Sequence, residues 1–222
     1  MFELNHREVH IWKAHLEPTK NVLRQYARLL SDTERERATA LRFEENRNRW
    51  IIARATLRQL LGHYLQTTPE SIALGSHANG KPHIVAASGI EFNLSHSAEL
   101  AIFAFCQQPV GIDVEKKRLI PDATELSLRY FSDDRQLLVK ESNPRERSTA
   151  FLRCWTRKEA LLKASGSGLS DLASSPTEFS QEWTTTELDV GEYYVAAIAM
   201  RPSFECLAMR TWTFTLTPSS LH

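Results

Sequence analysis

The chain has 222 residues, 42% of them hydrophobic, and its 27 Lys and Arg residues equal its 27 Asp and Glu residues in number. This length and apolar content can form a core, which excludes a disordered or fibrous chain, and the zero net charge disfavours a whole surface that binds nucleic acid or anionic membranes. Because the N-terminus lacks the apolar stretch of a secretory signal and no run approaches the roughly 20 apolar residues of a membrane span, we expect a cytoplasmic protein with neither nucleic acid nor membrane as a partner.

The first half of the chain begins with a predicted strand and continues with helices. Residues 8–15 alternate polar and apolar side chains, a pattern typical of a half-buried strand, and a short helix is expected after Pro18. The sequence Ser31-Asp-Thr-Glu34 is a capping box, which predicts a helix that begins at Ser31. A longer helix follows over about 44–65, and the sequence at 79–82 predicts a turn. Three strand-like runs come next, at 90–94, 100–106 and 110–115.

The second half repeats this order of events. A second Ser-Asp pair at Ser132 opens a predicted helix, a long helix follows over about 149–165, and two apolar runs at 193–200 and 204–214 are strand-like. The parallel extends to single residues: Arg54 and Arg58 lie four and eight positions after Trp50, as Glu159 and Lys163 do after Trp155. We interpret this as an internal duplication, with chance similarity between two amphipathic helices as the alternative. A duplication would pack two similar halves face to face with a cleft between them.

Two carboxylates share one face of a predicted strand. Asp113 and Glu115 in Gly111-Ile-Asp-Val-Glu115 are two residues apart, so both side chains project to the same side. Like charges held together repel unless a cation lies between them. Oxygen ligands without a nearby His or Cys favour Mg²⁺, with Mn²⁺ as the alternative. A solvated strand end is the competing interpretation of the same pattern.

A third carboxylate and a lysine share one face of the helix that starts near Trp155. Glu159 and Lys163 are four residues apart, which by itself is also the spacing of an ordinary surface salt bridge. The apolar neighbours Ala160 and Leu161 instead indicate a largely packed helix. A carboxylate and an ammonium beside a metal ion form a site suited to phosphate chemistry, in which positive charge meets the oxygens of the leaving group.

Polar and basic residues elsewhere could bind phosphate. Ser95 and His96 directly follow the predicted strand at 90–94. The absence of a G-x-S-x-G motif argues against a serine hydrolase. A lone histidine is often structural, so this assignment stays open at the level of residues alone. Lys81 follows a glycine, and Arg37 and Arg54 lie on helices of the first half, where solvated arginines are also common.

Four motifs occur in a fixed order and together resemble a known family. They are Gly80-Lys81-Pro82, Phe92-Asn-Leu-Ser-His-Ser97, Gly111-Ile-Asp-Val-Glu115 and Trp155-Thr-Arg-Lys-Glu-Ala-Leu-Leu-Lys-Ala-Ser-Gly166. They are similar to the successive signatures of the 4′-phosphopantetheinyl transferases, in the larger, surfactin-synthetase-activating type. This resemblance implies an α+β fold of two similar halves related by pseudo-twofold symmetry, with the active site in the cleft between them. We expect a monomer that resembles a dimer of its halves, residues 1–108 binding the coenzyme A phosphates and residues 109–222 carrying the metal site and catalytic helix.

The resemblance also implies an activity and a set of site residues. Such enzymes move the 4′-phosphopantetheine group of coenzyme A onto a serine of an apo acyl or peptidyl carrier protein and release adenosine 3′,5′-bisphosphate. By similarity, Mg²⁺ would be held by Asp113, Glu115 and Glu159. Lys163 would contact the diphosphate, and Glu159, directly or through water, is the candidate base. The remaining coenzyme A contacts would come from Lys81, Ser95, His96, Arg37 and Arg54, the last two near the 3′-phosphate.

Two positions depart from the family pattern. Arg135 stands where many relatives carry a glutamate, and Glu34 stands where some carry a lysine, so neither of those roles carries over. One alternative function is a metal-dependent phosphoesterase that acts on coenzyme A or another nucleotide with water as the acceptor. A non-catalytic protein that binds carriers is a third possibility.

Overall fold

The computed structural model describes residues 3–77, 80–86, 88–167, 182–201 and 208–217. Its first half contains a strand, three helices, a short two-stranded hairpin and a pair of longer strands. The elements in chain order are β1 (Glu8–His15), α1 (Lys20–Arg28), α2 (Asp32–Thr39), α3 (Glu44–Leu65), the 3₁₀ turn η1 (Pro69–Ser71), β2 (Leu74–Ser76), β3 (Pro82–Ile84), β4 (Glu91–Ser97) and β5 (Leu100–Cys106).

The second half follows with the same kinds of element. They are β6 (Val110–Lys116), α4 (Ala123–Tyr130), α5 (Asp133–Glu141), α6 (Arg147–Ser165), β7 (Thr184–Leu188), β8 (Tyr194–Met200) and β9 (Ala208–Phe214). Each half thus runs from a strand through three helices to an antiparallel strand pair. The strand orders β4-β5-β1 and β7-β8-β6 correspond, since in both the last strand of the pair lies beside the first strand of the half. The strand pairing therefore repeats as the sequence parallel suggested, while a twofold relation between the halves stays a prediction.

The last described strand crosses back into the first sheet. β9 pairs in parallel with β1, with Glu8 opposite Ala208 and Ala14 opposite Phe214, and completes the order β4-β5-β1-β9. Residues 202–207 lie outside the described part, so the predicted start of this strand at 204 is untested. The division of the chain at 108/109 likewise stays a prediction.

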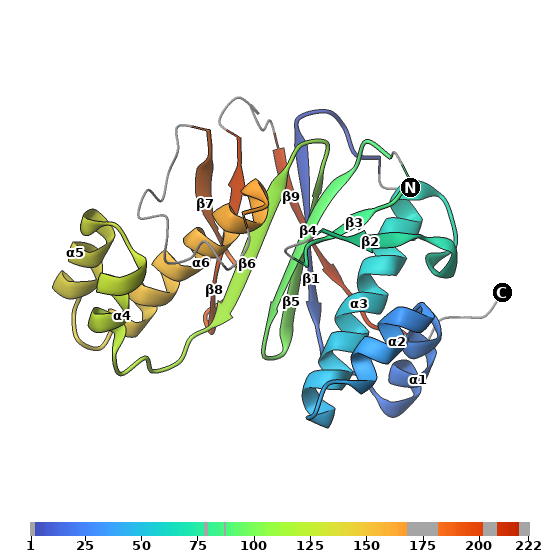
Figure 1. Cartoon of the computed structure of the whole chain (residues 1–222), viewed down its shortest axis with the longest axis horizontal. Helices are drawn as coiled ribbons and strands as arrows, with labels where there is room; N and C mark the ends of the chain where they lie inside the picture. The colour runs from blue at the N-terminus through green and yellow to red at the C-terminus, as the bar shows by residue number, and fades with distance from the viewer. Residues whose placement is uncertain (1–2, 78–79, 87, 168–181, 202–207, 218–222) are drawn as a thin grey trace.

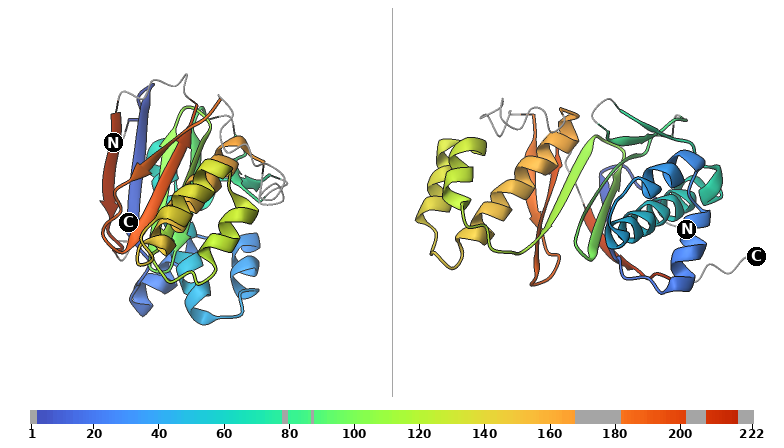
Figure 2. Two further views of the ribbon diagram at one scale, coloured as in Figure 1. Left: turned by 90° about the vertical axis from the view of Figure 1, so that its left-hand side faces the viewer. Right: turned by 60° about the horizontal axis from the view of Figure 1, so that its bottom comes forward.

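Two sheets lie face to face between two layers of helices (Figure 1). Figure 2 shows that α1–α3 and α4–α6 keep to the outer sides of their own sheets. The alternation of side chains on β5 explains this arrangement. Phe103 and Phe105 face the core under α3, whereas Ile102 and Ala104 face the second sheet and pack with Ile112 of β6 and its neighbours. Every residue of β5 is consequently buried.

Local signals account for several element boundaries. The capping box at Ser31 is confirmed: Ser31 Oγ accepts from the Glu34 backbone N–H, and Glu34 Oε2 accepts from the Ser31 N–H at 2.8 Å. The helix expected over 44–65 is α3, and the strand expected over 8–15 is β1. Ser132 precedes α5 but makes no side-chain cap hydrogen bond. No described helix is both long and apolar enough to cross a membrane.

One predicted strand is longer than its sequence pattern indicated. The run at 90–94 was expected to end before Ser95, but β4 continues to Ser97 because its last residues pair with β5, Ser97 standing opposite Leu100. Ser95 and His96 are therefore neighbours on a strand, and their side chains point to opposite faces.

Candidate active site

Two serines of β4 face two carboxylates of β6. Ser95 Oγ donates a hydrogen bond to Asp113 Oδ1 at 2.7 Å, and Ser97 Oγ donates to Glu115 Oε2 at 2.9 Å. Residues two apart on a strand share a face, so the two pairs match in spacing. They join the strands across the two sheets, because β4 and β6 belong to different sheets. The contact of Ser97 with Glu115 was not predicted, although the equal spacing of the two pairs is visible in the sequence.

A glycine brings helix α6 against β6. A Cβ atom on Gly111 would lie 1.9 Å from the carbonyl oxygen of Ala160 and 2.4 Å from the backbone nitrogen of Ala164. Only glycine therefore allows this approach. The approach places Lys163 on Asp113: its Nζ lies 2.6 Å from Asp113 Oδ1 and donates to Ser95 Oγ at 3.1 Å.

Two buried acidic side chains lie at this contact. Asp113 and Glu159 are 5% and 7% exposed, respectively. Burial disfavours a charged carboxylate, so it raises the pKa of both groups. The negative charge of Asp113 adds to burial at Glu159 and raises the pKa of Glu159 to about 7. The ammonium of Lys163 opposes both increases without cancelling them.

The donor atoms at this site suit a hard divalent cation. Asp113 Oδ2 is buried and has no hydrogen-bond partner among the described residues, and the nearby acceptors are carboxylate oxygens, the ligands that Mg²⁺ and Mn²⁺ prefer. Within the described ranges, however, no three His, Cys, Asp or Glu side chains gather closely enough to hold a metal ion. Asp113, Glu115 and Glu159 thus do not form a preassembled cluster, and their role as metal ligands stays a prediction. Glu115 is instead paired with Arg118 at 2.8 Å.

The opposite face of β4 borders a cavity of about 300 Å³, which we call the arginine cavity. Its walls include Arg37, Trp50, Arg54, Leu94 and His96. The structure thereby brings together three of the predicted phosphate-binding residues: Arg37, Arg54 and His96. The guanidinium of Arg37 lies over the ring of Trp50, 5.9 Å from its centroid. An aromatic ring, aliphatic walls and arginines suit a ligand with a flat base and an anionic group.

Lys81 does not line the arginine cavity, although Gly80 and Pro82 on either side of it do. Its Nζ donates to the carbonyl oxygens of Lys163 at 2.8 Å and Val110 at 3.1 Å. Burial lowers its pKa. In this conformation the ammonium links the last turn of α6 to the start of β6, and its contact with phosphate stays a prediction.

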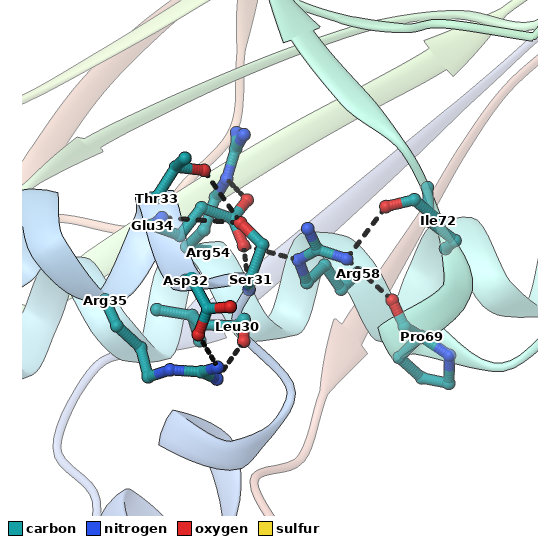
Figure 3. A network of polar contacts seen from close by, with 10 residues as sticks. All are labelled: Leu30, Ser31, Asp32, Thr33, Glu34, Arg35, Arg54, Arg58, Pro69 and Ile72. Atoms are coloured by element: carbon teal, nitrogen blue, oxygen red, sulfur yellow. Dashed lines mark hydrogen bonds and ion pairs between the residues drawn. The ribbon is translucent and has the colours of Figure 1, made fainter.

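The two departures from the family pattern have different surroundings. Glu34 lines the arginine cavity and accepts hydrogen bonds from Arg54 Nε at 2.5 Å and Arg58 Nε at 2.7 Å (Figure 3). Arg135 lies 3.8 Å from Asp134 at the start of α5. The charge pattern alone did not reveal the Glu34 contacts, because they join residues 20 and 24 positions apart in the chain.

Sequence comparisons identify similar proteins over most of the chain. The model of the 4′-phosphopantetheinyl transferase superfamily matches residues 109–215, and the model described as 4′-phosphopantetheinyl transferase, N-terminal, matches residues 14–108. The chain is 35% identical over 207 residues to the 4′-phosphopantetheinyl transferase HetI of Nostoc sp., covering 87% of each chain. It is 30% identical to the 4′-phosphopantetheinyl transferase Sfp of Bacillus subtilis, over 66% of this chain and 64% of Sfp. Identity to AcpT of Salmonella typhimurium, also a 4′-phosphopantetheinyl transferase, is 27% over 74% of this chain and 79% of AcpT.

Proposed function

The chain belongs to the 4′-phosphopantetheinyl transferase superfamily, and from this premise we propose that it transfers the 4′-phosphopantetheine group of coenzyme A to a serine hydroxyl of an apo carrier protein. The serine oxygen forms a bond to the phosphorus that carries pantetheine. The bond from that phosphorus to the bridging oxygen breaks, and adenosine 3′,5′-bisphosphate leaves. The observation that carries the proposal is the contact of Asp113, Ser95 and Lys163 beside the buried Glu159.

Lys163 and Glu159 have complementary roles in this reaction. The ammonium of Lys163 supplies positive charge to the leaving phosphate, a form of stabilisation that is strong in a site shielded from water. Glu159, whose pKa is raised to about 7 by burial and by Asp113, would accept the proton of the serine hydroxyl directly or through water. A carboxylate of ordinary pKa would be a weaker base at neutral pH.

The other predicted residues bind and orient the two substrates. Asp113, Glu115 and Glu159 would hold Mg²⁺, with Mn²⁺ as the alternative, and the metal would neutralise charge on the coenzyme A diphosphate. Arg37 and Arg54 would bind the 3′-phosphate in the arginine cavity, which His96 also lines. Lys163 would contact the diphosphate, and further contacts with the coenzyme A phosphates would come from Ser95, His96 and Lys81. Because most of the barrier to such a transfer is lowered by positioning and charge, this division of labour suits the chemistry.

We also propose the cellular setting and state of assembly. The enzyme would act as a cytoplasmic monomer whose two halves place the site in the cleft between them. Its partners would be acyl or peptidyl carrier proteins, since both kinds present a serine to enzymes of this family.

The product mixture tests this function. Coenzyme A and Mg²⁺ should yield adenosine 3′,5′-bisphosphate in amounts equal to the apo carrier consumed, and none when the carrier serine is replaced by alanine. The relatives give no support to the phosphoesterase alternative, which predicts breakdown of coenzyme A by water without any carrier. Nucleotide release at the same rate with and without carrier would therefore contradict the proposal.

A further inference from the structure

A single carboxylate beside the arginine cavity receives hydrogen bonds from three donors. Glu34 Oε1 accepts from Arg54 Nε, and Oε2 accepts from Arg58 Nε and from the backbone N–H of Ser31. Figure 3 shows Arg54 and Arg58 reaching the Glu34 carboxylate from different directions. Burial alone would raise the pKa of Glu34, but the hydrogen bonds from Arg58 and Ser31 outweigh it and hold that pKa below its ordinary value. Glu34 is therefore ionised and fixed at neutral pH.

Arg58 anchors this carboxylate from the interior. Its side chain is 2% exposed, and its Nη1 donates to the carbonyl oxygens of Pro69 at 2.8 Å and Ile72 at 3.0 Å. These carbonyls precede β2, whose Leu74 is part of the cavity wall. Arg58 is not among the described residues that line the cavity, and its Nε and Nη1 both bind protein acceptors. Its contribution is to fix Glu34 and the wall of the cavity.

Arg54 is held differently. Glu34 is its hydrogen-bond partner among the described residues, and the bond uses Nε alone. The guanidinium has five N–H donors in a rigid plane, so the two terminal nitrogens remain for the cavity that Arg54 lines. Those terminal nitrogens form the edge that binds a phosphate through two parallel hydrogen bonds. Fixing Nε therefore fixes the direction in which this edge points.

The charges around the arginine cavity match one class of anion. Arg37 and Arg54 on the cavity wall and the buried Arg58 behind Glu34 contribute three positive charges, and Glu34 removes one, which leaves two with His96 neutral. A phosphate monoester carries about −1.5 to −2 at pH 7. A phosphodiester or a carboxylate carries only one negative charge. The balance thus favours a terminal phosphate over either of these groups.

We propose that Glu34 is a positioning residue that, held by Arg58, turns the terminal edge of Arg54 into the arginine cavity and makes that cavity selective for a phosphate monoester. The inference rests on the proposed function for the identity of the ligand, the 3′-phosphate of coenzyme A, which is the single monoester of that molecule. Although Glu34 also lines the cavity, its proposed effect on the ligand is exerted through Arg54.

Binding of coenzyme A and of 3′-dephospho-coenzyme A, measured by calorimetry without a carrier protein, tests this role. The wild-type protein should bind coenzyme A at least tenfold more tightly than it binds 3′-dephospho-coenzyme A. Glu34→Gln keeps the size of the side chain but removes its charge. It should weaken coenzyme A binding about tenfold, the size of one lost charge-assisted hydrogen bond, and change dephospho-coenzyme A binding less than twofold.

Asp32→Asn provides the matched control. It removes one negative charge from the same turn of α2, but Asp32 is exposed and pairs with Arg35, outside the cavity. Its ratio of affinities for the two coenzymes should equal that of the wild type. Glu34→Gln combined with Arg58→Met covers the case in which the single variant fails to fold, because it also removes the buried cation left unpaired. This double variant should show the same loss of selectivity.

Two results with the Glu34→Gln variant would overturn the proposal. Tighter coenzyme A binding by Glu34→Gln would mean that Glu34 competes with the phosphate for Arg54, and equal weakening of both coenzymes would mean that Glu34 only supports the fold. Failure of the proposed function is a separate outcome. A wild-type protein that prefers coenzyme A but modifies no carrier contradicts the transferase activity, while the role of Glu34 is still decided by the variants. A wild-type protein with no preference for coenzyme A over 3′-dephospho-coenzyme A would also overturn the proposal, because the cavity would then not select a phosphate monoester.

Discussion

Replacing Glu159 by glutamine should make the protein more stable above neutral pH, although the same change should abolish most of its activity. Glu159 is 7% exposed and lies in helix α6 near the buried Asp113. Its pKa is raised from 4.5 to about 7, first by burial and then by the charge of Asp113. The folded protein therefore pays a free-energy cost whenever Glu159 is ionised.

The size and sign of the effect follow from proton linkage. Each pKa unit corresponds to about 1.4 kcal/mol, so the rise from 4.5 to about 7 costs about 3 kcal/mol at pH 8. This group's pKa is higher in the folded state, so the stability of the wild type falls as pH rises from about 4.5 to 7 and changes little above that range. Glutamine has no such charge, and the advantage of the variant should shrink to a few tenths of a kcal/mol near pH 4.5.

Urea denaturation between pH 4.5 and 8.5 measures this difference directly. Glu141→Gln, the same substitution at an exposed position of α5, should show no pH-dependent gain. Mg²⁺ should stabilise the wild type at pH 8 more than the Glu159→Gln variant, since the metal would offset the charge that the variant lacks. A variant whose unfolding free energy differs from the wild type by the same amount at every pH would refute the reasoning.

Three further predictions address the metal, the lysine and the helix contact. Removal of divalent cations with a chelator should abolish carrier modification. Mg²⁺ should restore it more fully than Ca²⁺, because Mg²⁺ matches small oxygen sites that also bind phosphate. Undiminished activity in the presence of the chelator would exclude a role for a divalent metal ion in the transfer. Lys163→Met should lower kcat about 10²- to 10³-fold with a smaller change in the KM for coenzyme A. Because Lys163 is the partner of Asp113 Oδ1, the unfolding free energy of this variant must be measured as well. A change confined to KM would contradict a role at the leaving group. Gly111→Ala should destabilise the fold by about 3 kcal/mol or more, since its Cβ would meet the Ala160 carbonyl at 1.9 Å. The control Gly191→Ala changes a glycine with no neighbour within 4 Å but a positive φ, and it should cost only about 1 kcal/mol. Equal effects at both sites would contradict the close approach of α6 and β6.

Local signals made a large part of the fold predictable. The alternation of residues 8–15 and the periodicity of 44–65 depend on neighbours in the chain, and the structure confirms both as β1 and α3. The short strands β2 and β3 and the helix α4 have no comparable pattern and were not predicted. The pairing of β9 with β1 joins the two ends of the chain, and no local pattern specifies such a contact.

The motifs predicted which residues lie together at the candidate site, but not which atoms pair there. The motifs indicated that Asp113, Ser95 and Lys163 belong to one site, and the structure brings them into hydrogen-bond contact. The hydrogen-bond partners of the two lysines were not predictable. Both were expected to contact phosphate, but in the structure Lys163 pairs with Asp113 and Lys81 with backbone carbonyls. Such choices depend on distances of a few ångströms between elements, which spacing along the chain does not determine.

The intact mass of an apo carrier protein, measured after incubation with the enzyme, coenzyme A and Mg²⁺, tests the central claim most directly. A panel of fatty-acid, polyketide and peptide carriers should include at least one whose mass increases by a single phosphopantetheine group on its serine. The Glu159→Gln variant should modify a much smaller fraction of that carrier in the same time. Unchanged mass across the whole panel, with the wild-type enzyme folded and Mg²⁺ present, would contradict the account.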